Sequence, residues 1–134
     1  MFVWYLSTVL LRQSVKSALR EVSGLKAVFP KKAPATQAPP YVVFKLDLMT
    51  KEENIAQFQL TVYVSGYGAD DTAVEDLTDK IQFGMDYASY QDERMAWDCY
   101  LTNRQDVDAA DKNIQCRRLD FTLRYMGGKS YESV

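Results

Sequence analysis

Residues 54–88 carry a hydrophobic pattern that changes its period half-way along. From Phe58 to Val64 apolar and more polar residues alternate, which predicts a half-buried β-strand because successive strand side chains point to opposite faces. The segment 65–68, Ser-Gly-Tyr-Gly, ends this strand. Helical spacing then predicts an amphipathic helix over 71–87, where Thr72 and Glu75 have the spacing of a capping box. Its apolar stripe contains Ala73, Val74, Leu77, Ile81 and either Met85 or Ala88.

The hydrophobic pattern of the rest of the chain predicts the other elements. A first helix spans 7–23, with Gly24 placed as its C-cap and Arg20 in its last turn, where a cation is favoured. A short strand is possible over 25–29. Long strands are expected over 41–48, from residue 55, over 93–103 and over 114–126, and the polar turn 49–54 predicts an antiparallel hairpin. Segments 87–92 and 105–113 are expected to be loops. The inward-facing strand positions are Val42, Phe44, Leu46, Leu48, Met95, Trp97, Cys99, Leu101, Leu119, Phe121, Leu123 and Tyr125.

The element order predicts an α+β fold: a single-layer antiparallel sheet of about four main strands with two helices packed on one face. Each long strand has one apolar and one more polar side, as a sheet with one solvated face requires. We expect Phe58, Leu60, Val62, Leu77, Ile81, Leu119, Phe121 and Leu123 to form one core between the sheet and the helices.

Residues 1–134 are expected to form a single domain with three distinctive segments. The apolar segment 1–6 lacks the basic region and cleavage site of a signal peptide and is too short to span a membrane. It either packs on the protein's own core or forms an arm that another chain covers. Residues 30–40 hold four prolines and predict a loop or an extended arm. Gly127 and Gly128 are expected to end the ordered pattern, leaving a C-terminal tail over 127–134.

Charge is unevenly divided along a chain whose net charge is only −2. Residues 1–48 carry seven Lys and Arg against two acids, a net +5, whereas residues 49–134 carry nine against sixteen, a net −7. Such a split either has no functional meaning or sets up a contact in which a basic face of one copy meets an acidic face of the next. The low net charge argues against a protein whose main task is to hold nucleic acid. Cys99 and Cys116 have opposite strand parity, so we expect two reduced thiols rather than a disulfide.

No pattern of catalytic residues is apparent. The chain has no histidine, which removes the commonest general base and metal ligand, and it has no nucleophile or phosphate-binding motif. Acidic clusters at 52–53, 70–71 and 106–111 fall in turns or at a helix start, where solvation explains them better than a hydrolytic pair. We expect no enzyme activity, no cofactor and no metal. The basic pairs Lys31-Lys32 and Arg117-Arg118 are typical surface charge, with a weaker case for contact with a nucleic acid backbone.

The arrangement resembles the tail terminator, or tail completion, proteins of long-tailed bacteriophages. The resemblance covers residues 8–126 and rests on the order and character of the elements, not on an exact motif. These elements are an N-terminal helix, a Pro-rich loop, the strand segments 38–44 and 58–64, the helix 71–87 and the strand 119–125. Tyr63 and Tyr67 lie where the family has an aromatic residue before its second helix. The segment 1–6 and the length of the Pro-rich arm depart from that pattern.

The resemblance implies a homohexameric ring that caps the phage tail tube, ends its polymerisation and faces the head-completion complex. DNA would pass through the lumen without specific binding, and the protein would lie in the tail-neck region of the virion after synthesis in the host cytoplasm, with no membrane partner. Two alternatives stay open: a neck or head-completion protein of the same virion, and a non-viral cytosolic binding domain. The residues expected at a subunit or tail-tube interface are Phe2, Trp4, Tyr5, Lys31, Lys32, Tyr41, Arg117 and Arg118.

Overall fold

The chain folds into two helices and a curled sheet, seen here in a computed structural model. The structure describes residues 2–5, 7–69, 71–109 and 111–131, with side chains from residue 7 to residue 127. The elements in chain order are β1 (Phe2–Tyr5), α1 (Thr8–Ser23), β2 (Val28–Pro30), β3 (Tyr41–Lys51), β4 (Ile55–Tyr67), α2 (Asp71–Met85), β5 (Ser89–Gln91), β6 (Met95–Val107) and β7 (Ile114–Tyr131).

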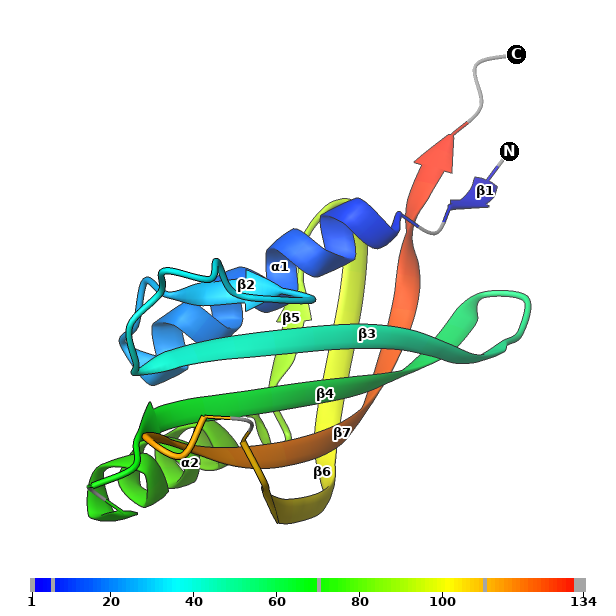
Figure 1. Cartoon of the computed structure of the whole chain (residues 1–134). Coiled ribbons are helices and arrows are strands. Elements are labelled where there is room, and N and C mark those ends of the chain that lie inside the picture. The colour runs from blue at the N-terminus through cyan, green and yellow to red at the C-terminus, as the bar shows by residue number, and fades with distance from the viewer. Residues whose placement is uncertain (1, 6, 70, 110, 132–134) are drawn as a thin grey trace.

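The sheet has the order β2-β3-β4-β7-β6-β5, and β1 pairs separately with the far end of β7. All described pairings are antiparallel except that of β2 with β3, which makes the sheet mixed. Figure 1 shows the sheet curling, so that β6 runs steeply across β3 and β4. The predicted α+β class with four long antiparallel strands is confirmed, and the structure adds short strands to it.

Both helices pack on the same face of this sheet and complete one core. Seven of the eight expected core residues are at most 2% exposed, and Leu77 is partly buried against them. The limits predicted for the first helix are also confirmed. The Ser7 hydroxyl accepts a hydrogen bond from the Leu10 N–H at 3.2 Å, and Gly24 forms the C-cap with φ of 73°.

Four expectations for the strands are wrong, and pairing with another strand explains three of them. Residues 2–5 form β1, whose Trp4 lies opposite Lys129, so β7 continues through the two glycines to Tyr131. Residues 105–107 extend β6 because they pair with residues 116–118 of β7. Residues 89–91 form the edge strand β5. Leu48, expected to face inward, is 52% exposed near the tip of the β3–β4 hairpin, although it lies opposite the buried Phe58.

The predicted capping box at the start of α2 is also wrong. The helix begins at Asp71, so Thr72 already lies inside its first turn. The Glu75 carboxylate accepts hydrogen bonds from Arg104 and Arg117. Charged donors from the sheet therefore take the carboxylate that the capping box would use.

The prediction for the cysteines is confirmed. Both thiols are free: Cys99 is buried on the face that packs against the helices, whereas Cys116 is half-buried. Burial raises the pKa of the Cys99 thiol to about 12.

Candidate assembly surfaces

A groove with an apolar floor and a positively charged rim lies between the start of α1 and the middle of β3. Its volume is about 430 Å³, and its floor includes the core side chains Leu11, Phe44 and Phe58. Lys31 has a left-handed backbone (φ of 71°), and its N–H donates to the Phe44 carbonyl at 2.9 Å, which holds the turn after β2 beside β3. We call this surface the basic groove; its charged lining residues are Arg12, Lys31, Lys32, Lys45 and a single acid, Asp47.

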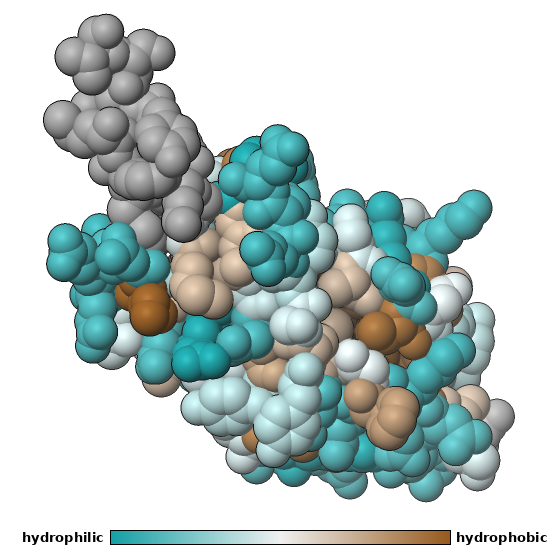
Figure 2. Space-filling view, turned by 180° about the vertical axis from the view of Figure 1, so that it is seen from behind, coloured by the Kyte–Doolittle hydropathy of each residue, from teal (hydrophilic) through white to brown (hydrophobic). Residues whose placement is uncertain are grey.

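The outward side of α2 carries two aromatic side chains that are almost fully in solvent. Phe83 is 88% exposed and Tyr87, just beyond the helix end, is 84% exposed. They border a depression together with Asp79, Gln82 and Asp86, and we call these five residues the acidic aromatic ridge. Large contiguous apolar patches on a monomer often mark association surfaces, which makes this aromatic pair a candidate for one. Figure 2, which shows the molecule from behind, has tan and brown apolar areas gathered across its middle between teal hydrophilic side chains.

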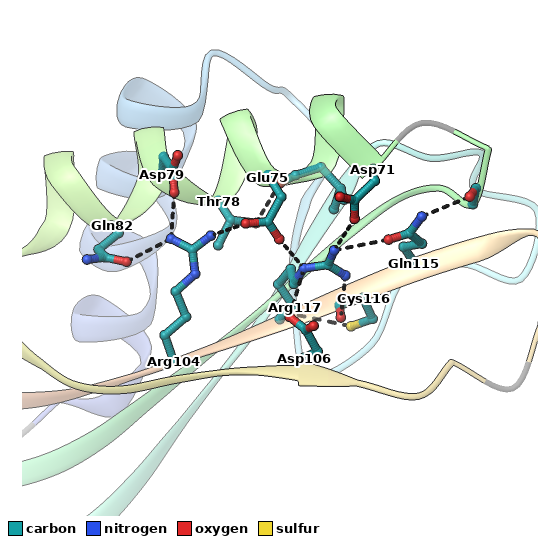
Figure 3. Close-up of polar contacts among 12 residues, drawn as sticks. Asp71, Glu75, Thr78, Asp79, Gln82, Arg104, Asp106, Gln115, Cys116 and Arg117 are labelled. Atoms are coloured by element: carbon teal, nitrogen blue, oxygen red, sulfur yellow. Dashed lines mark hydrogen bonds and ion pairs between the residues drawn. The ribbon is translucent and has the colours of Figure 1, made fainter.

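A nearly buried arginine of the sheet fastens the first half of α2 (Figure 3). The side chain of Arg117 on β7 is only 7% exposed. Its guanidinium contacts Asp71 at 2.6 Å and Asp106 of β6 at 3.0 Å, and its Nε donates to Glu75. Three carboxylates from two elements thus surround one cation, and every one of them remains partly in contact with water.

Arg104 of β6 adds a second connection to the same helix. It contacts Glu75 at 2.8 Å and Asp79 at 2.6 Å, and it donates to the Gln82 side-chain oxygen at 3.0 Å. The hydrogen bond from Arg117 holds the pKa of Glu75 below its ordinary value of 4.5, against the opposing effect of burial. Burial alone would lower the pKa of Arg117, but its hydrogen bond with Glu75 and the surrounding carboxylates raise it. Both groups therefore stay charged at neutral pH.

Arg118 lies on the opposite face of the sheet from Arg117 because adjacent strand residues alternate. Its Nε is 3.0 Å from an oxygen of Asp120, and its guanidinium carbon is 5.8 Å from the centre of the Tyr63 ring. The Lys45 ammonium is 5.9 Å from the same ring centre. The two arginines of the doublet thus take part in separate contacts within the chain.

The eight residues that the sequence places at an interface do not form one surface. Lys31 and Lys32 lie together, exposed, on the rim of the basic groove. Their assignment to an interface, like that of the others, stays a prediction. Of the remaining six, Phe2, Trp4 and Tyr5 belong to β1, and their side chains lie outside the described part of the chain. Tyr41 is half-buried at the start of β3. Arg117 is paired within the chain, and Arg118 lies on the opposite face of the sheet from it.

Sequence reasoning missed the acidic aromatic ridge, although a signal for it was present. Phe83 and Tyr87 are four residues apart and fall off the apolar stripe of the predicted helix. An aromatic pair off the buried stripe has to lie in solvent or against a partner. The basic groove had only the pair Lys31-Lys32 as a signal, because its rim brings together residues from α1, β3 and the turn after β2.

Among the described residues, no group of three or more Cys, Asp or Glu is arranged to hold a metal ion. No helix in the described ranges is long and apolar enough to cross a membrane.

Comparison with known proteins gives matches in structure alone. No protein-family model matches the chain, and no curated protein sequence does. A chain from the virion of a native gene transfer agent particle is similar in fold, with a TM-score of 0.65 and 15% identity over 89% of this chain and 92% of that one. A second solved chain, which carries no descriptive name, has a TM-score of 0.64 and 13% identity over 96% of this chain and all of the other. This protein therefore shares its fold, nearly end to end, with a virion chain.

Proposed function

We propose that this protein is a structural component of a phage-like virion and acts as its tail terminator. In this role six copies form a ring that caps the finished tail tube, stops further tube polymerisation and joins the tail to the head-completion complex. DNA passes through the lumen without specific binding. The observation that carries the proposal is the fold shared, over 89% of this chain, with a chain of the gene transfer agent virion.

The surfaces of the chain support a role in assembly. The basic groove and the acidic aromatic ridge share no residue, so one copy can present both at once. A contact between two different surfaces is heterologous, and it closes into a ring when the rotation between copies allows. The uneven charge of the chain, +5 over residues 1–48 and −7 over residues 49–134, favours such a contact.

Imaging of particles made with and without the protein tests the proposal. Particles are produced from a genome in which the gene is intact, deleted, or deleted and supplied in trans, and their tails are measured by electron microscopy. A terminator predicts tails of uncontrolled length, or tails that fail to join heads, in the deletion alone. Antibody labelling of intact particles is expected at the head-tail junction.

Two other outcomes separate the alternatives. Normal tails with heads that leak DNA would contradict the terminator role and indicate a neck or head-completion protein. Absence of the chain from purified particles, together with unchanged assembly after deletion, would contradict any virion role and leave a cellular binding domain.

A further inference from the structure

We infer that neighbouring copies of this chain bind by inserting the acidic aromatic ridge of one copy into the basic groove of the next. The inference rests on the ring of the proposed function and specifies which surfaces meet in it. The ridge consists of Asp79, Gln82, Phe83, Asp86 and Tyr87, and the groove is the one bordered by Arg12, Lys31 and Lys32.

The ridge has the features of a binding anchor. Phe83 and Tyr87 expose 88% and 84% of their surface, although an aromatic side chain typically buries about 150–250 Å² when it packs. Aromatic anchors at the centre of an interface supply much of its binding energy when a pocket on the partner receives them. The fold itself gains little from leaving both rings in water.

The groove has the matching shape and chemistry. Its volume of about 430 Å³ lies within the range of about 300–1,000 Å³ that is usual for binding pockets. Leu11, Phe44 and Phe58 give it an apolar floor. Arg12, Lys31 and Lys32 make its rim positive, whereas the Lys45 ammonium lies by the Tyr63 ring on the other face of the sheet. The rim therefore attracts a partner that brings carboxylates beside its aromatic rings.

The charged groups on and beside the ridge differ in whether they already have partners within the chain. Asp79 is already paired with Arg104, and the Asp86 carboxylate accepts a hydrogen bond from the Leu101 N–H at 2.8 Å. Lys80 lies one residue from Asp79 along the helix, near Gly24. No ion pair of Asp86 is found among the described residues, so its negative charge is the one most available to the basic groove.

Both surfaces are held in place before binding. The floor of the groove is part of the core, and the first half of α2 is fastened to the sheet by Arg104 and Arg117. Such preorganisation reduces the conformational entropy that is lost on association. A second copy of this chain is therefore a suitable occupant for each surface.

Photo-crosslinking tests the contact directly. Phe83 is replaced by p-benzoylphenylalanine in the full chain, and ¹⁵N-labelled and unlabelled chains are mixed so that mass spectrometry identifies links between copies. The sample is irradiated as concentrated protein in low salt and again within purified particles. The expected link joins residue 83 of one copy to residues 8–12 or 30–47 of another. The same photoreactive residue at Tyr67, which is 55% exposed elsewhere, is the matched control and should not give that link.

Association measurements test the two sides separately. Phe83→Ala, and Lys31→Glu combined with Lys32→Glu, are each expected to weaken association of the chains by about 30-fold or more, the loss typical of a binding hot spot. Tyr67→Ala should change it by less than about threefold, as a substitution outside the contact does. Added salt should weaken the wild-type contact, because part of it is electrostatic. Thermal unfolding of each variant shows that the fold is kept, as expected for side chains this exposed.

The outcomes distinguish this inference from the proposed function. Rings that form and cap tails, but give links from residue 83 to other regions or to the tube protein, would overturn the contact and leave the function standing. Absence of any link between copies in both samples would overturn the contact as well. Links to the groove in a chain whose deletion leaves tails unchanged would support the contact and contradict the terminator role.

Discussion

Replacing Arg117 by Met removes the cation that fastens α2 to the sheet while keeping an unbranched apolar side chain in place of the arginine stem. In a fully buried ion pair, the loss of one partner typically costs about 3–5 kcal/mol because the other charge is left without compensation. Here the carboxylates left behind are those of Glu75, Asp71 and Asp106, whose side chains are 39%, 69% and 82% exposed. Water can solvate them, so the cost should fall below that range.

The expected loss in the free energy of unfolding is therefore about 2 kcal/mol, near the value of one well-formed hydrogen bond between charged groups. Urea denaturation at pH 7 measures it, and the m-value should not change if the folded and unfolded states keep their exposed areas. Arg94→Met is the matched control. Arg94 is 63% exposed and lies 3.7 Å from Asp92, so its loss should stay within about 0.5 kcal/mol.

The pH dependence gives this prediction a second readout. Arg117 lowers the pKa of Glu75 from its ordinary value of 4.5, so the pair stabilises the fold above that pH. The stabilisation is lost as the pH falls through the lower pKa of Glu75 in the folded chain. The difference between the wild type and Arg117→Met should thus be largest near pH 7 and shrink below pH 4.5. A difference no larger than that of Arg94→Met, or one that stays constant down to pH 3, would refute the reasoning.

Three other predictions follow from packing. In Gly84→Ala the new Cβ would lie 2.6 Å from a methyl carbon of Val22, so the variant should lose about 1–3 kcal/mol of stability, and adding Val22→Ala should restore part of it in urea titrations. Phe121→Ala empties a fully buried position and should cost about 3–5 kcal/mol, whereas a loss under about 0.5 kcal/mol would contradict its burial. Cys99, whose pKa burial raises to about 12, should resist maleimide at pH 8 in the folded chain; labelling as fast as in urea would contradict this.

Periodicity predicts the elements that bury one face in the core. Segments 7–23, 55–67 and 71–85 each show it clearly, and each forms the helix or strand expected. The short strands carry no such pattern. All three residues of β5 are exposed, so burial imposes no alternation on them. Residues 2–5 gain their strand partner from residues 128–131 at the other end of the chain, and local sequence cannot reveal such a pairing.

The candidate surfaces differ in how far the sequence reveals them. Strand parity alone puts Arg117 on the same side as Leu119, under the helices, so the division of the arginine doublet between two faces was predictable. The three carboxylates around Arg117 were not, because α2, β6 and β7 are brought together only by the tertiary fold. For the same reason the rim of the basic groove could be read only in part, from Lys31 and Lys32.

The contacts that stabilise α2 also determine how charge is distributed along it. Arg104 and Arg117 pair with Asp71, Glu75 and Asp79 in the first part of the helix. Beyond that point the surface holds Phe83, Asp86 and Tyr87, close to where Gly84 lets α1 approach at Val22. The first half of α2 thus contributes ion pairs that stabilise the fold, whereas the second half keeps a negative charge and two aromatic rings in solvent. Changes at Arg117 should therefore act mainly on stability and changes at Phe83 mainly on association, which makes the two roles of the helix separable by mutation.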